Sequence, residues 1–158
     1  MADSKRETAV NALKTRLQTI TTGNGYETDI GSNVKIYFPA EIELDDDTLP
    51  LVNIKDGDTD ISLFDDDLGP ITIGKERQRI NMSIHIRMAE GTNTAVYLRK
   101  AIADVYKAIG TDRRLGGAVF EIFPSSHTMG VTQTDRVIGS ADIVLSVFLE
   151  TGLFNPYS

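Results

Sequence analysis

The chain has 158 residues, contains no cysteine and carries a formal net charge of −7. This length can bury one hydrophobic core, so we expect a single domain over residues 1–158. Without cysteine, disulfides and thiolate metal sites are excluded, and a reducing cytosol is favoured as the place of assembly.

The acidic residues are concentrated in one segment, at about 41–67. From Glu41 to Asp67, acidic residues outnumber basic ones eleven to one, which leaves a small positive charge on the rest of the chain. Affinity for nucleic-acid phosphates requires clustered Lys and Arg, so the surface as a whole is not expected to bind DNA. We interpret residues 41–67 as an acidic insertion.

The chain begins with a pattern typical of an amphipathic helix. Ser4 and Glu7 form a capping box ahead of apolar residues at helical spacing, which predicts a helix from about Lys5 to Ile20. Charged residues interrupt the apolar runs here, so no signal peptide is expected. No segment approaches the ~20 apolar residues that span a bilayer, so no contact with a membrane is expected either.

Three strands are predicted next. The first covers Val34–Phe38 and is closed by Pro39, and the second covers Leu49–Ile54 between two solvated acidic loops. The third, Arg79–Met88, alternates strictly between apolar and polar residues, as a half-buried strand does. Its start is open, because Ile71 and Ile73 could belong to it and Gly74 could mark a bulge.

The second half of the chain predicts one helix and two strands. The helix is capped by Thr92, Asn93 or Thr94 and ended by Gly110. A strand at Ala118–Phe123, a loop at Pro124–Thr134 and an alternating strand at Ala141–Glu150 follow. The order α-β-β-β-α-β-β predicts an α+β fold, with a largely antiparallel sheet and two helices packed on one face.

Catalytic and cofactor motifs are not found in the sequence. His85 lies on the polar face of a strand, and His127 follows two serines without the glycine-flanked elbow of a serine hydrolase. The segment Asp56–Asp60 resembles a calcium loop, but Ile61 stands where the EF-hand pattern needs glycine. We therefore expect no enzyme, cofactor or metal, with a small cation-binding hydrolase as the less favoured alternative.

A basic row on the polar face of the long strand is the first candidate interface. Lys75, Arg77, Arg79, His85 and Arg87 share one parity. This row is either a solvated sheet face or a contact for an acidic loop of another copy, in which case reversing the charge of Arg77 and Arg79 should dissociate the oligomer. The acidic candidates are Asp56, Asp58, Asp60, Asp65, Asp66 and Asp67.

The C-terminal tail is the second candidate interface. Leu153, Phe154 and Tyr157 follow the last strand. Such apolar side chains are expected to leave water, either by folding back on the chain's own core, which we favour slightly, or by docking on a neighbour.

The order of these pieces resembles the tail terminator, or tail completion, proteins of long-tailed, lambda-like bacteriophages. The likeness runs from about Glu7 to Gly152. It comprises the amphipathic helices, the strand TLPLVNI, the Asp-rich insertion, the strand RQRINMSIHIRMAE and the closing DRVIGSADIVLSVFLETG.

The resemblance implies a structural virion protein that assembles in the host cytoplasm as a hexameric ring. Such a ring caps the head-proximal end of the tail tube, stops its polymerisation and offers a surface to the head-completion protein. DNA would pass through the lumen without specific binding, and residues of 41–67 could line it. The alternative within this class is another tail-tube or head-tail connector ring subunit.

Overall fold

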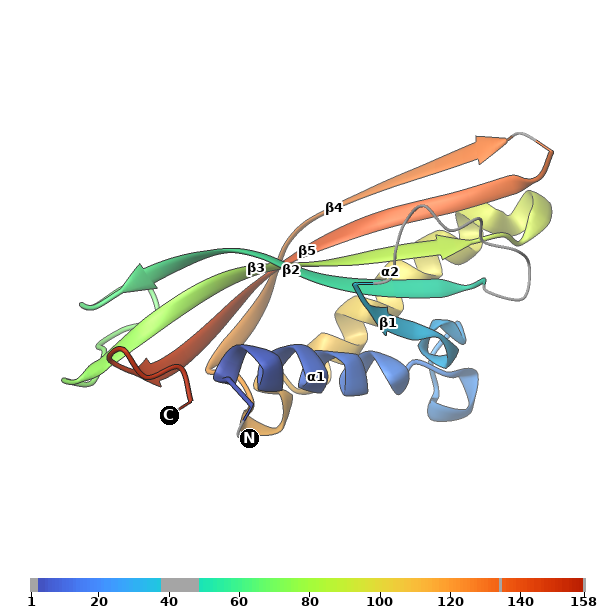
Figure 1. Ribbon diagram of the computed structural model, residues 1–158. Helices are drawn as coiled ribbons and strands as arrows, with labels where there is room; N and C mark the ends of the chain where they lie inside the picture. Colours follow the sequence, from blue (N-terminus) through green and yellow to red (C-terminus); the bar gives the residue numbers. More distant parts are fainter. Residues whose placement is uncertain (1–2, 38–48, 134, 158) are drawn as a thin grey trace.

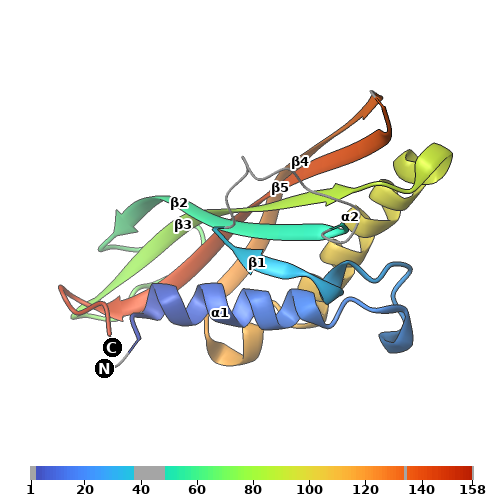
Figure 2. The same ribbon diagram turned by 45° about the vertical axis from the view of Figure 1, so that its right-hand side comes forward.

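The computed structural model describes residues 3–37, 49–133 and 135–157, and these form one mixed sheet with two helices (Figure 1). The strand order is β1-β2-β3-β5-β4; β1 runs parallel to β2, and the other neighbours are antiparallel. The two turned views place both helices on the same face of the sheet (Figures 1 and 2). The predicted α+β class, element order and two-layer arrangement are confirmed.

Helix α1 covers Lys5–Gln18 and begins as the capping motif predicts. The Ser4 hydroxyl accepts a hydrogen bond from the Glu7 amide at 3.2 Å, which satisfies one of the free amides of the first turn. Its buried side chains recur at helical spacing and face the sheet: Ala9, Val10, Leu13 and Leu17.

Helix α2 covers Thr94–Thr111 and buries apolar side chains at helical spacing, among them Leu98, Ile102, Val105 and Ile109. It also buries a carboxylate, that of Asp104, which accepts from the amide of Thr28 at 2.9 Å and from its hydroxyl at 2.7 Å. These bonds tie the segment after α1 to α2 and satisfy a charge that would otherwise be costly to bury.

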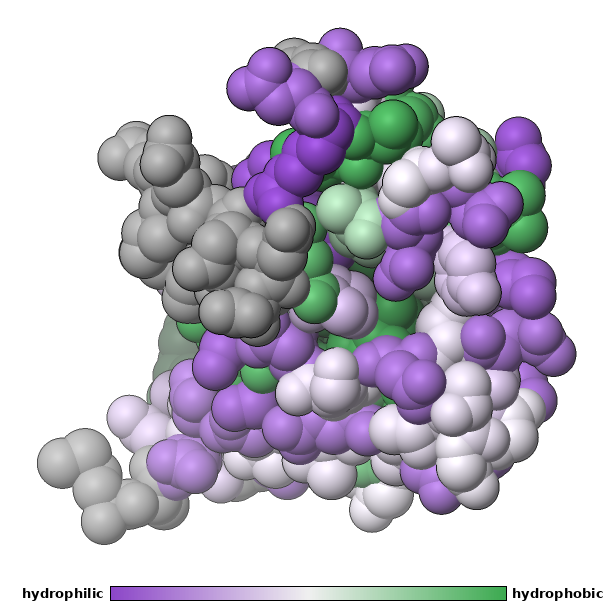
Figure 3. Space-filling view, turned by 90° about the vertical axis from the view of Figure 1, so that its right-hand side faces the viewer, coloured by the Kyte–Doolittle hydropathy of each residue, from purple (hydrophilic) through white to green (hydrophobic). Residues whose placement is uncertain are grey.

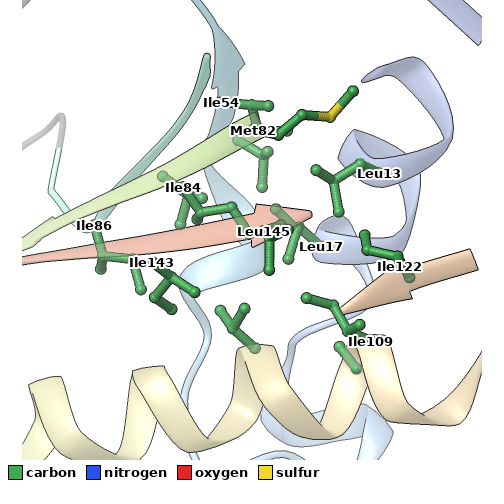
Figure 4. Close-up of a cluster of buried hydrophobic side chains, with 14 of the residues drawn as sticks. Leu13, Leu17, Ile54, Met82, Ile84, Ile86, Ile109, Ile122, Ile143 and Leu145 are labelled. Atoms are coloured by element: carbon green, nitrogen blue, oxygen red, sulfur yellow. The ribbon is translucent and has the colours of Figure 1, made fainter. Parts of the chain in front are cut away.

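The core lies between the helices and one face of the three central strands. Leu13 and Leu17 of α1 and Ile109 of α2 point at Met82, Ile84, Ile143 and Leu145 of the sheet (Figure 4). Burying each such side chain contributes roughly 1.5–3 kcal/mol, so this layer supplies most of the driving force for folding.

The central strands are longer than the sequence indicates. Strand β3 covers Lys75–Met88 and pairs along its whole length with β5, which covers Val137–Gly152. Ile71 and Ile73 precede the strand, and Gly74 has a φ of 82°, so it belongs to the turn that enters β3 and does not form a bulge inside it.

Strands β1 and β2 differ from the predicted strands. Strand β1 is Val34–Ile36, and the predicted ends Phe38 and Pro39 lie outside the described residues. Strand β2 is Leu51–Ser62, so the segment Asp56–Asp60 is a strand paired with β3 and the predicted loop is wrong there.

Strand β4 is Glu121–Gln133, and the predicted loop at Pro124–Thr134 is also wrong. The segment pairs with β5 up to Gln133, with a register shift between Pro124 and Ser126. Beyond Phe123 the side chains are exposed, so the sequence shows no alternation of apolar and polar residues there. The segment is a strand because its backbone pairs with β5.

One tight contact seats the end of α1 against the segment that follows it. A Cβ atom on Gly31 would lie 2.7 Å from the carbonyl oxygens of Leu17 and Ile20. These are backbone atoms, which cannot move aside without distorting the last turn of α1, so only glycine fits.

We therefore expect Gly31→Ala to lower the free energy of unfolding by about 1–3 kcal/mol, the usual cost of overpacking. Gly23→Ala is the matched control, because its Cβ would meet only one side-chain atom at 3.9 Å. Urea unfolding of both variants measures the difference, and equal stabilities would contradict this packing argument.

Candidate assembly surface

Exposed apolar side chains gather at one end of the sheet, where β2 ends and β3 begins. We call this the end patch and define it as Leu63, Phe64, Ile73, Leu153 and Phe154. Phe64 is 82% exposed, Ile73 101% and Phe154 91%. All but Phe154 line a groove of about 560 Å³ together with the half-buried Ile71. Fully exposed large apolar groups in one place are typical of a surface that another molecule covers.

Two chain segments build the end patch, and backbone hydrogen bonds hold them together. The connection from Leu63 to Gly74 turns at Gly69, whose amide donates to the Asp66 carbonyl at 2.9 Å. The C-terminal segment lies against it, because the Leu153 amide donates to the Gly74 carbonyl at 2.9 Å. Hydrogen bonds therefore hold the backbone of the patch in place, and the two segments lie side by side at the same end of the sheet (Figure 1).

The buried side chain of Arg77 stabilises this end of the sheet through ion pairs and a hydrogen bond. Its guanidinium is 2% exposed, pairs with Asp66 and with Glu150 Oε1 at 2.6 Å, and donates to the Gly69 carbonyl at 3.1 Å. The guanidinium carbon also lies 4.3 Å from the centre of the Phe120 ring. Arg77 thus joins the Leu63–Gly74 connection to β5.

The predicted exposed basic row is therefore wrong at Arg77. Strand parity placed this residue among solvated bases, but the Leu63–Gly74 connection folds over it. Burial by itself lowers the pKa of Arg77, and hydrogen bonds to Glu150 and Asp66 outweigh burial and raise it, so the guanidinium stays charged. Charge reversal at Arg77 would disrupt the fold and cannot report on an interface.

A bulge in β2 separates the acids that resembled a calcium loop. Asp56 pairs with Met82 and Thr59 with Ile80, so Gly57 and Asp58 together face a single residue of β3. The extra residue shifts the side-chain parity. Asp56 and Asp60 therefore lie on opposite faces of the sheet, and the described residues contain no group of three or more His, Asp or Glu side chains that could hold a metal ion.

The carboxylate of Asp56 is bound by Arg6 and Tyr37 of the same chain. Arg6 of α1 pairs with it through Nε and reaches the Gly57 carbonyl at 2.7 Å, while the Tyr37 hydroxyl lies 2.6 Å from Asp56 Oδ1. Burial raises the pKa of Asp56, but hydrogen bonds from Tyr37 and Arg6 outweigh it and hold the pKa below its ordinary value.

A lowered pKa makes stability depend on pH in a defined direction. The charged Asp56 stabilises the fold above its unfolded pKa of about 4, and this contribution is lost as pH falls through the lower folded value. We expect Asp56→Asn to cost about 1.5–3 kcal/mol at pH 7 and less at pH 3. Urea unfolding at both pH values, with the exposed Asp58→Asn as control, tests this. A cost independent of pH would contradict it.

The remaining predicted interface residues lie on the surface. Asp58, Asp60, Asp65 and Asp67 are exposed, and Arg87 is half-buried. Lys75 is exposed beside a second hollow, which Lys5 and Arg114 also line. Arg79 donates to Ser146 Oγ at 3.2 Å on the sheet face that bears no helix. A contact of these residues with another copy stays a prediction.

The C-terminal tail does not fold back on the core. Tyr157 is 60% exposed and Phe154 almost fully exposed, although the tail backbone is held by a hydrogen bond from the Lys5 amide to the Pro156 carbonyl at 2.9 Å. The fold-back interpretation is therefore wrong, and docking on a neighbour stays a prediction.

The opposite end of the sheet carries a different surface, which we call the arm. It comprises residues 126–133 of β4, paired with the first residues of β5, and it projects past the rest of the sheet (Figure 1). From Pro124 to Gln133 the strand has no charged residue, and Met129 and Val131 are 39% and 44% exposed. Seen from this end, apolar surface shows beneath the polar tip of the hairpin (Figure 3).

Among the described residues, no hydrogen bond joins either histidine to a serine hydroxyl. His85 Nδ1 lies 2.7 Å from Asp142 Oδ1, and His127 Nδ1 lies 2.8 Å from the Tyr106 hydroxyl. The two rings lie on opposite faces of the sheet, since His127 faces α2 and His85 faces away from it. They do not converge on one site.

The signal for the end patch is present in the sequence but is not periodic. Leu63, Phe64 and Ile73 lie in the connection on either side of Asp65, Asp66 and Asp67. Large apolar residues next to an acidic turn, without strand or helix spacing, are candidates for exposed contacts.

Comparison of the chain with models of known protein families gives no match, and comparison with curated proteins gives none either. No helix among the residues described is long and apolar enough to cross a membrane.

Proposed function

We propose that this chain is a structural ring subunit that caps the head-proximal end of the tail tube of a long-tailed bacteriophage. The observation that carries the proposal is the end patch, a concentration of almost fully exposed Phe and Ile side chains, whereas most other large apolar residues in the described part of the chain are buried. Large exposed apolar patches typically mark surfaces that bind other molecules. The order of the elements, which resembles the tail terminator proteins, supports the proposal further.

The size of the end patch suits an assembly contact. Phe64 and Phe154 together expose roughly 350 Å², taking ~200 Å² for a whole Phe side chain. The Leu and Ile side chains bring the patch toward the ~800 Å² that each partner buries in a standard interface. The exposed area therefore suits a subunit interface of ordinary size.

Capping would work by occupancy. The last ring of a tail tube exposes the surface that the next tube ring would use, and the terminator ring would cover it and present a different surface to the head-completion protein. Only complementary packing is needed, with no covalent step. The net charge of −7 would keep DNA from adhering as it passes through the lumen.

Growth of tail tubes in the presence of the chain tests this function. Purified tube protein from the same phage should polymerise to shorter tubes when the chain is added, and tube length in electron micrographs should fall as the ratio of chain to tube protein rises. Tube lengths that do not respond to an excess of the chain would overturn the proposal. Long filaments of the chain alone would favour the alternative, a tube subunit.

A further inference from the structure

We infer that the end patch of one copy binds the arm of a second copy, so that the chain assembles through head-to-tail contacts between the two ends of its sheet. This contact rests on the proposed function in one assumption, that another protein chain covers the end patch. The proposed function leaves open which surfaces of two copies meet, and here they are the end patch and the arm.

The end patch is a poor partner for itself. Two patches that meet about a two-fold axis would bring their borders together, and the border of this patch includes Lys75 and Asp65 in the groove and Asp67 close by, all exposed. Neither of these acids forms an ion pair among the described residues. With two acids and one base, each border keeps a net negative charge, and net like charges that face each other oppose association, so a two-fold contact of patch on patch is disfavoured.

The arm has the properties that the end patch requires of a partner. It presents Met129 and Val131 without a charged residue between Pro124 and Gln133, so it brings no charge into an apolar groove. Strand β4 is also an edge of the sheet, and natural sheet edges are normally protected by charges, prolines or bulges. After Ser126 this edge carries none of these devices, which favours its burial in an assembly.

The edge formed by the distal part of β2 is protected, in contrast. The bulge at Gly57 interrupts it, Asp58 and Asp60 add charge, and Arg6 occupies the Gly57 carbonyl at 2.7 Å. The distal edge of β2 is therefore blocked, whereas the edge of β4 after Ser126 is open. Since the end patch and the arm lie at opposite ends of the sheet, each copy offers one of each to its neighbours. The contact then repeats in one direction and forms a ring where the rotation between neighbours closes.

Cross-linking with engineered thiols tests the contact directly, because the natural chain has no cysteine. Ile73→Cys places a thiol in the end patch and Val131→Cys places one on the arm. A short bis-maleimide should join a mixture of the two variants into dimers, and a chain with both substitutions into a ladder of larger species. Gln18→Cys, on the exposed side of α1, replaces the arm variant in the control mixture.

The initial rate of cross-linking of the Ile73→Cys and Val131→Cys pair should exceed that of the control pair by roughly a thousandfold, because bound thiols face each other at millimolar effective concentration while free chains are micromolar. Efficient cross-linking of Ile73→Cys with itself would overturn the inference in favour of a two-fold contact. A yield no higher than that of the control mixture would overturn it as well.

A mixing experiment checks the direction of the contact without cross-linker. Ile73→Glu leaves the arm intact and Val131→Glu leaves the patch intact, so each variant alone should be monomeric in sedimentation velocity and the mixture should stop at dimers. A mixture that stays monomeric would contradict a head-to-tail contact. If the natural chain forms rings but the Ile73→Cys and Val131→Cys pair gives no cross-link, this contact is refuted and the proposed function stands. If the cross-linked variant forms rings but does not change tube growth, the proposed function is refuted and this contact stands.

Discussion

Replacing Arg77 with alanine is expected to lower the free energy of unfolding by about 3–5 kcal/mol, the usual cost of removing one partner from a buried ion pair. The substitution leaves the Asp66 and Glu150 carboxylates without their common cation and removes the bond to the Gly69 carbonyl. It therefore also loosens the connection that carries Leu63 and Phe64. Urea unfolding measures the loss of stability, and hydrogen exchange of residues 63–74 measures the loosening.

Arg79→Ala is the matched control for this substitution. Arg79 has the same strand parity, but it is exposed, and its hydrogen bonds within the described part of the chain go to the Ser146 hydroxyl, so we expect a cost within about 1 kcal/mol. If the two alanine variants had equal stabilities, Arg77 would not fasten the end of the sheet as the structure indicates.

Placing a carboxylate in the end patch is expected to abolish assembly without harming the fold. In the double substitution Phe64→Glu and Ile73→Glu, two almost fully exposed side chains become charged, so the free energy of unfolding should change by no more than about 0.5 kcal/mol for each. Loss of a hot-spot residue costs 2–4 kcal/mol of binding, so assembly should weaken by roughly thirtyfold or more. Light scattering over a concentration series measures the change.

The control places the same charge elsewhere on the surface. Gln18→Glu changes an exposed residue at the end of α1, away from the patch, and should assemble like the natural chain. Equal assembly of the double variant and the natural chain would show that the end patch is not a contact.

The sequence predicts those elements whose side chains face different surroundings on their two sides. Residues 80–88 of β3 and 141–149 of β5 alternate because one face lies on the core, and Leu98, Ile102 and Ile109 of α2 follow the helical period for the same reason. Strand β4 has exposed side chains beyond Phe123, so its sequence carries no period and only its pairing with β5 identifies it.

The candidate site was less predictable than the fold because it depends on contacts between distant segments. Parity correctly groups Arg77 with Arg79, but the burial of Arg77 follows from a connection that folds back and supplies Asp66 and the Gly69 carbonyl. The separation of Asp56 from Asp60 follows from one extra residue in β2, which no composition reveals. The exposed Phe154 was in a predicted interface, whereas Phe64 and Ile73 were not.

Negative-stain electron microscopy of the purified chain, alone and mixed with the tail tubes that we propose it caps, tests the central claim most directly. The account predicts ring-shaped particles with an axial hole, six-fold as in the family the sequence resembles, seated at one end of the tubes and absent for the Phe64→Glu and Ile73→Glu variant. Tubes that stay bare at both ends in an excess of the chain, with no rings in the background, would contradict it.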